Sequence, residues 1–397
     1  MRRYSLLLPP YTITSDMKNY IITLFLAVAT LSCQQGKNPS PKHHHAGAAY
    51  NTVDIIPTSD TIRFLLDEES FSDLESWSVR EISGKTYITF FDQVSESINI
   101  YSYPDNSHIN KIELQRFFKP TTVNSAYFHN YDSIFLTTRE ALYMIDSSGK
   151  NVKKFTFDRE SRQGRGRISP ENPLYLQHNT AFLAVSPSID NSSKSSIRSW
   201  KMLWTVNLEN NKTSRYYHLP EIYTENYYVG KLIKYSYCMN DAGRFVVSFA
   251  ADTMLYETDL KDYHHSYFAK SQYQLQPIKY SSRDKLREIK EEAKVYMTSD
   301  SYGSVYYDPY HHRYLRVAKP PISEDDFDAK RYQRPYRLII FDKHFKIIGE
   351  SDFEEGIDLR RMFFTPDGKI YAEVTSPTDY QFNFLRLEYK TNQVTDK

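Results

Sequence analysis

The chain has 397 residues, enough for one large domain or two ordinary ones. Fifty basic side chains against 49 acidic ones leave a formal net charge of +1, which gives no electrostatic basis for binding nucleic acid. Tyrosine (34) and phenylalanine (23) are abundant whereas glycine occurs only 12 times. Because aromatic side chains pack well on a pleated surface, the composition favours strands over helices.

Residues 1–32 have the layout of a secretory signal peptide. From Met17 a lysine is followed by an apolar run from Tyr20 to Leu31, and Ser32 is a small residue at the expected cleavage point. About a dozen apolar residues are too few to cross a hydrocarbon layer of ~30 Å comfortably. We therefore expect a signal peptide at residues 1–32, with the true start of synthesis at Met17.

Cys33 follows this segment directly and is the predicted site of lipid attachment. A small residue before a cysteine is similar to the lipobox of bacterial lipoproteins, although Leu31 stands two positions before the cysteine instead of three. Gln34 in place of aspartate favours the outer membrane, and the lack of an acidic cluster after Cys33 favours its periplasmic face. With Cys33 lipidated, Cys238 has no intramolecular partner, so no disulfide is predicted.

Residues 33–60 are predicted to form a flexible tether after the lipid. Their first half is rich in proline, alanine and other small or polar residues, a composition that cannot bury enough apolar surface to order itself. The run His43–His45 could bind a metal, but a flexible segment supplies no surrounding groups to fix the rings, so this interpretation is disfavoured. The sequence predicts no cofactor.

From residue 61 to residue 397 the chain repeats short strand-like runs separated by turn signals. Clear turn signals occur at 146–150, 240–244 and 366–369. Six units can be aligned on a core strand, and successive core strands lie roughly 45 to 65 residues apart, which fits one four-stranded blade with insertions. The six core strands are 87–91, 133–136, 181–185, 244–249, 304–307 and 370–374.

This pattern predicts an all-β fold, a six-bladed β-propeller over residues 61–397. Radial packing lets each small sheet bury both faces and leaves only short edges exposed. Residues 61–66, left over before the first unit, are expected to complete the last blade and close the ring. A pair of β-sandwiches is the main alternative, which explains the alternating strands but not six units in series.

One insertion interrupts the strands between the fourth and fifth units. Residues 282–296 consist of helix formers, with Leu286, Ile289, Ala293 and Tyr296 at helical spacing. We predict an amphipathic helix that packs on the ring, and a partner-binding helix is the disfavoured alternative.

Two charged segments are interpreted as solvated loops. Residues 162–167 (RQGRGR) form a basic stretch between the second and third units. Residues 324–328 (EDDFD) cluster carboxylates but lack the spacing and the glycine of a calcium-binding loop.

The segment that follows the inserted helix, residues 302–317, has the sequence YGSVYYDPYHHRYLRV. Its pattern of Tyr-Gly, Tyr-Asp, Arg-Tyr and Arg is similar to the pattern of an uncharacterised family. Together with the signal peptide, Cys33, the tether and the blades, it resembles the TolB-like six-bladed propeller lipoproteins of the Bacteroidota type, whose function is unknown. The resemblance implies the fold and a location in the cell envelope, but no activity.

The same segment contains the best candidates for a ligand site. Arginine forks bind carboxylates and tyrosine rings stack on apolar faces, so a polar mouth built from them suits a carboxylate or sugar ligand. In the alternative interpretation the aspartate starts an ordinary hairpin and pairs with an arginine. The predicted ligand-binding residues are Tyr307, Asp308, His312, Arg313 and Arg316.

No nucleophile elbow, phosphate loop, zinc-protease helix or paired CxxC motif occurs in the sequence. We therefore expect a non-catalytic ligand-binding or protein-interaction module, held at the membrane by its lipid, with an envelope protein, peptide or glycan as the candidate partner. The alternative is a propeller enzyme, a glycan or peptide lyase or hydrolase with its site in the central channel. Carboxylates and histidines converging at one channel mouth would favour the enzyme.

Overall fold

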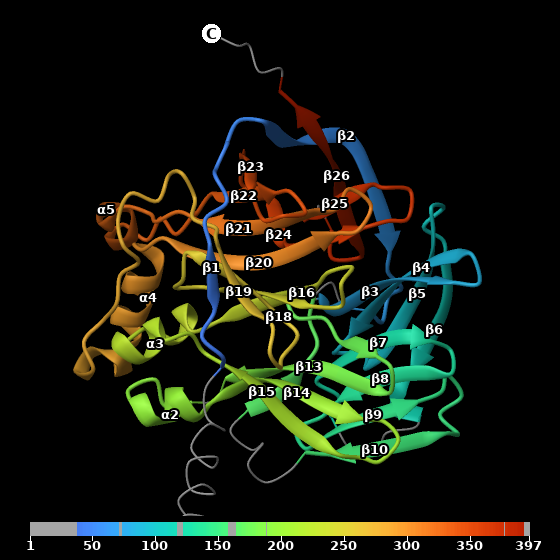
Figure 1. Cartoon of the computed structure of the whole chain (residues 1–397). Coiled ribbons are helices and arrows are strands. Elements are labelled where there is room, and N and C mark those ends of the chain that lie inside the picture. The colour runs from blue at the N-terminus through green and yellow to red at the C-terminus, as the bar shows by residue number, and fades with distance from the viewer. Residues whose placement is uncertain are drawn as a thin grey trace, which may run out of the picture. The chain divides into compact units, whose positions relative to one another are not determined.

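The computed structural model describes residues 38–70, 74–116, 122–157, 164–187, 189–376 and 378–392. Within residues 39–392 these form six β-sheets of four or five strands each, which confirms the predicted six-bladed all-β propeller (Figure 1). Met17, Cys33 and the predicted signal peptide lie outside the described residues.

Blades 1 to 3 are built from strands that follow one another in the chain and pair antiparallel. Blade 1 contains β3 (Leu74–Ile82), β4 (Lys85–Asp92), β5 (Ser97–Tyr103) and β6 (His108–Glu113). Blade 2 contains β7 (Ser125–Asn130), β8 (Ser133–Thr137), β9 (Ala141–Ile145) and β10 (Val152–Thr156). Blade 3 contains β11 (Gly164–Arg167), β12 (Tyr175–Gln177), β13 (Thr180–Pro187), β14 (Lys201–Asn207) and β15 (Thr213–His218).

Two of the remaining blades take their outermost strand from the N-terminal part of the chain. Blade 4 contains β16 (Tyr235–Met239), β17 (Phe245–Phe249), β18 (Met254–Thr258), β19 (His264–Phe268) and β1 (Lys42–His44). Blade 5 contains β20 (Ser301–Asp308), β21 (Arg313–Lys319), β22 (Tyr336–Phe341) and β23 (Ile347–Phe353). Blade 6 contains β24 (Ile357–Phe364), β25 (Ile370–Val374), β26 (Gln381–Thr391) and β2 (Val53–Leu65).

The first strand of each blade belongs to an inner ring around the propeller axis. Hydrogen bonds between side chains and backbone link these strands or the residues just beside them, so the ring does not depend on apolar packing alone. The linking bonds run from Ser76 to Ala126, from Ile168 to Ser125, from Asn172 to Tyr235, from Val305 to Ser236 and from Tyr306 to Leu359.

The ring closes where β2 pairs antiparallel with β26. Thr61 lies opposite Leu385, and Ile62 lies opposite Phe384. This pairing confirms that residues left over before the first unit complete the last blade. The strand is longer than predicted, because β2 begins at Val53.

The predicted tether at residues 33–60 is wrong for the part that the structure describes. Residues 39–52, which we call the strap, run along the outer strands of blades 4 and 5, and β2 then enters blade 6. His43 and His44 belong to β1. The composition did not reveal that these residues are ordered. They are held by edge strands that would otherwise be unpaired and that lie more than 200 residues away in the chain.

The helices are short, and α2, α3, α4 and α5 lie at the left of Figure 1. The predicted helix at 282–296 is broken: Glu288 has an extended conformation, and Ile289, expected on the packed face, is 86% exposed. Leu286 is buried as predicted. In the described residues the helices are η1 (Leu114–Arg116), α2 (Lys194–Ser199), α3 (Ile222–Glu225), η3 (Gly230–Leu232), η4 (Asp284–Arg287), α4 (Ile289–Met297) and α5 (Glu324–Asp328).

Two further expectations are corrected. Part of the predicted basic loop at 162–167 is β11, the inner strand of blade 3, where Arg165 and Arg167 are exposed. A Cβ on Gly164 would lie 2.3 Å from Val185, so glycine permits the close approach of this strand to β13. In blade 5 the predicted core strand at 304–307 is the first strand, β20, and the second strand is β21.

Candidate functional site

A pocket of about 470 Å³ lies between blades 4 and 5, at the end of the blades that carries their tight hairpins. This volume is within the range of small-molecule sites. We call it the interblade pocket. Its lining residues are Asn240, Asp241, Ala242, Arg244, Glu257, Tyr263, Tyr267, Tyr307, His312, Tyr314, Lys343, His344 and Phe345.

Stacked aromatic rings form one wall of the interblade pocket. Phe345 lies between Tyr267 and Tyr314, with ring centroids 4.0 and 4.3 Å apart, and all three side chains are buried. Tyr307 packs at a tilt on Tyr314, at 4.9 Å. Each ring therefore has a fixed position before any ligand arrives, which lowers the entropy that binding must overcome.

Glu257 is the centre of the hydrogen bonding behind this wall. Its buried carboxylate accepts hydrogen bonds from Tyr263 (2.8 Å), Tyr267 (3.0 Å) and Asn240 (2.8 Å), and Arg244 lies 3.5 Å away. Burial, followed by the hydrogen bond with Tyr263 and the charge of Glu257, raises the pKa of Tyr267, so this hydroxyl stays protonated and donating. A carboxylate has about four acceptor positions, so Glu257 is saturated and its role is structural.

The β16–β17 turn places one polar edge of the interblade pocket. Asn240 accepts hydrogen bonds from the backbone N–H groups of Ala242 and Arg244, and Gly243 has φ of +69°, a conformation that favours glycine. The turn signal predicted at 240–244 is thereby confirmed. The turn holds Asp241 at the rim, 57% exposed.

At this rim three polar side chains meet. His312 Nδ1 lies 3.0 Å from the Asp241 carboxylate and 3.2 Å from the Tyr307 hydroxyl, and Tyr307 donates a hydrogen bond to Asp241. Burial, and after it the hydrogen bond to Asp241, raises the pKa of Tyr307. Asp241 and His312 are both more than half exposed, so the pair adds little to stability but offers polar atoms to a ligand.

The structure brings together only two of the five predicted site residues, Tyr307 and His312. In the β20–β21 hairpin Tyr307 lies opposite Tyr314, and Asp308 lies opposite Arg313. Successive side chains of a strand point to opposite faces of the sheet. The first pair therefore faces blade 4 and lines the interblade pocket, while the second pair faces blade 6.

Asp308 and Arg313 belong to the hairpin and to the boundary with blade 6. The fully buried Asp308 carboxylate accepts hydrogen bonds from the backbone N–H groups of Tyr310 (3.0 Å) and His311 (3.1 Å), and from the Tyr389 hydroxyl (3.2 Å). The Arg313 guanidinium stacks on the ring of Tyr389 at 4.2 Å. These contacts fit the alternative interpretation, in which Asp308 organises an ordinary turn.

Arg316 faces blade 4 but is fully buried beneath the interblade pocket. Its guanidinium donates hydrogen bonds to the hydroxyl of Ser248 and to the carbonyl oxygens of Ala269 and Asp252, and it stacks on Tyr302 at 3.7 Å. Arg316 therefore ties blade 5 to blade 4 and has no polar atom at a mouth. The prediction that Arg316 lies at a polar mouth is wrong, because the position of a residue in a strand does not reveal how deeply its side chain is buried.

Most of the pocket was missed in the sequence because it comes from blade 4 and from the β22–β23 turn. One signal could have indicated it: Tyr263, His265 and Tyr267 alternate along one face of a strand that otherwise resembles a core strand. The missed lining residues that organise the site are Asn240, Asp241, Glu257, Tyr263, Tyr267 and Phe345.

The central channel contains a smaller polar group. Glu171 accepts a hydrogen bond from Ser304 (3.1 Å), and Arg360 binds Asp358 through both carboxylate oxygens. Burial acts to raise the pKa of Asp358, but the hydrogen bond and charge of Arg360 outweigh it and leave that pKa lowered. Asp358 is therefore ionised, and both of its carboxylate oxygens are already bound by Arg360. No cluster of three histidine, cysteine or acidic side chains that could hold a metal ion occurs among the described residues.

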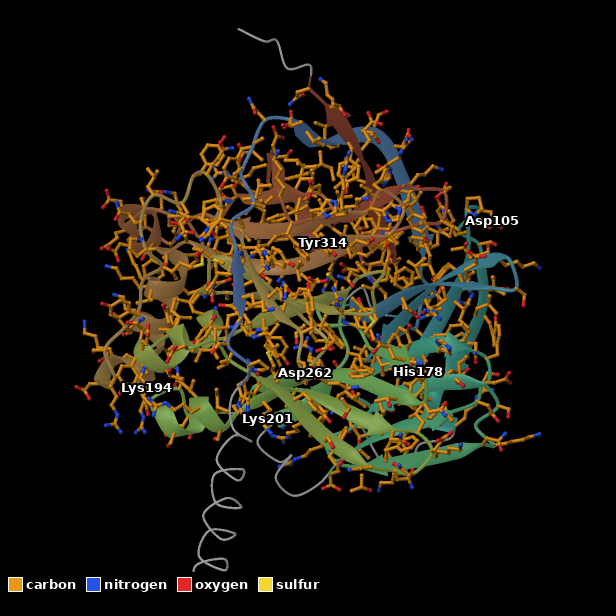
Figure 2. The ribbon with its side chains drawn as sticks, in the orientation of Figure 1. Asp105, His178, Lys194, Lys201, Asp262 and Tyr314 are labelled. Carbon is orange, nitrogen blue, oxygen red and sulfur yellow. The ribbon has the colours of Figure 1, made fainter. Side chains whose placement is uncertain are left out.

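A second cavity of about 650 Å³ lies between blades 6 and 1. It is lined by the β3–β4, β5–β6 and β24–β25 turns, and Tyr103 there donates a hydrogen bond to Asp367 at 3.0 Å. Figure 2 labels one lining residue of each cavity, Tyr314 and Asp105, and the two lie well apart. In the described part of the chain no helix is both long and apolar enough to span a bilayer.

The chain has relatives of known structure. A family described as a domain of unknown function (DUF4221) matches residues 52–352. The crystal structure of a DUF4221 member from Bacteroides vulgatus is 19% identical, covers 86% of this chain and 99% of its own, and has a TM-score of 0.73. Virginiamycin B lyase from Staphylococcus aureus is 8% identical, with coverage of 84% and 99% and a TM-score of 0.41. Regucalcin from Agrobacterium tumefaciens, a calcium-binding protein, is 9% identical, with coverage of 87% and 96% and a TM-score of 0.42. No curated protein matches the sequence.

Proposed function

Since the chain belongs to the DUF4221 family, which has no assigned function, we propose its function from the site: it is a non-catalytic binding module that holds a glycan in the interblade pocket. The observation that carries this proposal is the combination of a pre-stacked aromatic wall with polar side chains of both charges around one opening. Sugar rings combine apolar C–H faces with many hydroxyls, and such an opening offers partners for both.

The polar groups at the opening support a neutral, hydroxyl-rich ligand. Asp241 and His312 present an acceptor and a titratable nitrogen, and Lys343 and His344 add exposed donors from the β22–β23 turn. Because both cationic and anionic groups line the pocket, no single charge on the ligand is favoured. A peptide ligand is less well supported, since the outer strands of blades 4 and 5 beside the pocket are already paired with the strap.

A binding role is supported by what lines the pocket. Its lining includes no serine, threonine or cysteine that could act as a nucleophile beside His312. The enzyme alternative, with a site in the central channel, has weaker support, because Asp358 there is paired with Arg360 and is not poised to donate a proton.

We further propose that the protein is a lipoprotein of the outer membrane, attached through Cys33, and that it faces the periplasm. This part of the proposal depends on the signal-like segment at residues 1–32 and on Gln34 after the cysteine. Mass spectrometry of the purified protein for a diacylglyceryl group on Cys33 tests it, and a free Cys33 thiol in the mature protein would contradict it.

The binding function is tested with the full chain in a thermal-shift screen against a glycan panel, with peptides as a second panel. A glycan at about 100 times its Kd should stabilise the fold by ~2.7 kcal/mol through mass action. Asp241→Ala should weaken binding about tenfold, because it removes the acceptor at the rim, and Tyr307→Phe should weaken it a few-fold. The matched control is Tyr216→Phe, which removes an exposed hydroxyl on blade 3.

Three outcomes would contradict the proposal. Stabilisation by peptides alone would identify a different ligand class. Cleavage of a panel glycan, seen by mass spectrometry, would show an enzyme. Binding that is unchanged in both Asp241→Ala and Tyr307→Phe would place the ligand elsewhere, and the cavity between blades 6 and 1 would be the next site to test.

A further inference from the structure

The strap contacts the strand that supplies part of the aromatic wall. β1 pairs parallel with β19, with Lys42 opposite His265, His43 opposite Ser266 and His44 opposite Tyr267. Because side chains alternate along both strands, His44 lies on the same face of blade 4 as His265 and Tyr267. This is the face that lines the interblade pocket.

Beside the backbone pairing, histidine side chains make hydrogen bonds between the strap and β19. His44 Nε2 lies 2.8 Å from His265 Nδ1, and the two rings are stacked at 4.7 Å. On the other face His43 Nδ1 lies 2.7 Å from the Ser266 hydroxyl, and His264 Nδ1 donates to the carbonyl oxygen of residue 39. Docking of the strap therefore depends on the protonation of histidines from both strands.

These rings continue into the pocket wall. His44 stacks on Tyr267 at 5.2 Å, and His265 stacks on Tyr263 at 4.0 Å. Tyr263 and Tyr267 are the two hydroxyl donors to Glu257. The strap is thus the outer layer of the wall whose inner layer lines the interblade pocket.

We propose that His44 is a positioning residue of the interblade pocket: by pairing with His265 it holds the Tyr263 and Tyr267 side chains in place, and protonation of the pair releases the strap and loosens the wall. The positioning role stands on the contacts of the strap alone. Its consequence for ligand affinity rests on the proposed function.

Acid breaks the pairing for two reasons. A hydrogen bond between two imidazole rings needs one neutral nitrogen as acceptor, which a doubly protonated pair lacks. Two positive rings would also repel at 2.8 Å, and only one of the nearby ionised side chains is an anion. The charged and titratable groups that face the pair are Lys42, Arg244, Glu257, Tyr263 and Tyr267, with His43 and His264 on the opposite face of the strands.

The pH window follows from the two histidines of β19. Burial, and after it the neighbouring His44, lowers the pKa of His265. Burial also lowers the pKa of His264, although its hydrogen bond to the backbone opposes this. Release of the strap would let the pKa values of His264 and His265 return to about 6.5. The two histidines therefore stabilise docking fully above about pH 6.5. This stabilisation is lost as the pH falls through the lower pKa values that His264 and His265 have in the docked state.

Hydrogen exchange of the full chain, followed by mass spectrometry, measures strap docking without a ligand. After correction for intrinsic exchange, the protection of β1 (residues 42–44) should fall at least tenfold between pH 7.5 and pH 5.0, while the protection of β13 stays constant. His44→Ala should lose the protection at both pH values. His44→Phe keeps a stacking ring and removes the repulsion between residue 44 and His265, so its protection should fall less between pH 7.5 and pH 5.0 than that of the wild type. His45→Ala, an exposed neighbour beyond the paired residues, is the matched control.

Nitration of Tyr267 with tetranitromethane at pH 8 measures the wall itself. Tyr267 is 9% exposed, so it should react slowly in the wild-type protein and in His44→Phe, and at least fivefold faster in His44→Ala. Strap protection that persists at pH 5.0 would overturn the acid release. Unchanged nitration of Tyr267 in His44→Ala would overturn the positioning role. If both results are as expected and no glycan binds, the proposed function fails while the positioning role stands.

Discussion

The boundary between blades 6 and 1 and the boundary between blades 4 and 5 share one architecture but differ in chemistry. The first is filled by apolar and aromatic side chains from both blades, among them Trp77, Phe363 and Phe384. The second buries Arg316 and Glu257 beside tyrosine rings. The two ends of the propeller chain meet within blade 6, where β2 pairs with β26, and the first boundary joins that closing blade to blade 1 through apolar contact, which requires no single orientation.

The boundary between blades 4 and 5 is ordered in a different way, by specific polar contacts. Each buried polar group there has specific partners, so the side chains around the interblade pocket are held in one arrangement. Buried polar networks of this kind cost desolvation and are stable only when fully satisfied. We infer that the apolar boundary beside the closing blade tolerates adjustment, and that ligand binding uses the boundary that does not. Four substitutions test this contrast.

Trp77→Ala should have the largest effect on stability, about 4 kcal/mol, because it empties a large aromatic site at the boundary between blades 6 and 1. Trp77 packs edge-on against Phe384 at 5.1 Å and Phe363 at 6.0 Å. Urea unfolding of the full chain measures the change. Trp77→Phe should cost much less, since apolar contact needs no particular polar partner, and an equal loss in both variants would argue against the tolerance that we infer here.

Arg316→Met should cost about 3 kcal/mol, because it leaves buried carbonyl oxygens of blade 4 without a donor. The side chain is similar in length, so the loss reports hydrogen bonding more than volume. The same unfolding experiment measures it, with Arg313→Met at the hairpin as the control. A neutral or stabilising result would mean that the buried guanidinium is not needed to join blades 4 and 5.

Glu257→Gln should cost about 2 kcal/mol and weaken ligand binding. The new NH2 group cannot accept, so either the two tyrosine hydroxyls at Oε2 or Asn240 and Arg244 at Oε1 lose their acceptor. Stability and glycan affinity are both measured, and Glu140→Gln at an exposed position serves as the control. If affinity remained unchanged while stability fell, the wall would not contribute to binding.

Asp241→Asn should have the smallest effect on stability, below about 0.5 kcal/mol, because the pair with His312 is exposed to solvent. Its effect on glycan affinity should be larger than its effect on stability. A stability loss above 1 kcal/mol in thermal unfolding would show that the rim is structural and would weaken the contrast between rim and wall.

The sequence was sufficient for features that local chemistry determines. Alternating runs and turn signals located the blades, and the closing role of residues 61–66 followed from counting strands. It was insufficient for features that depend on distant partners. The strap is ordered by an edge strand far along the chain, and in blade 5 the insertion after β21 hid which strand comes second. Prediction of the site was limited in the same way, because the adjacent residues Tyr307 and Asp308 face different neighbouring blades.

If Cys33 carries the proposed lipid, the docked strap also limits how far the propeller can move from the membrane. From Cys33 to residue 39 there are only six peptide units, which at full extension reach about 20 Å. A lipid on Cys33 would therefore keep the outer strand of blade 4 within that reach of the headgroups. Release of β1 would lengthen the free chain about 2.5-fold, from six peptide units to fifteen, because it would then be free as far as the contacts of residues 48–52 with β23. The same event would change both the pocket and its height above the bilayer.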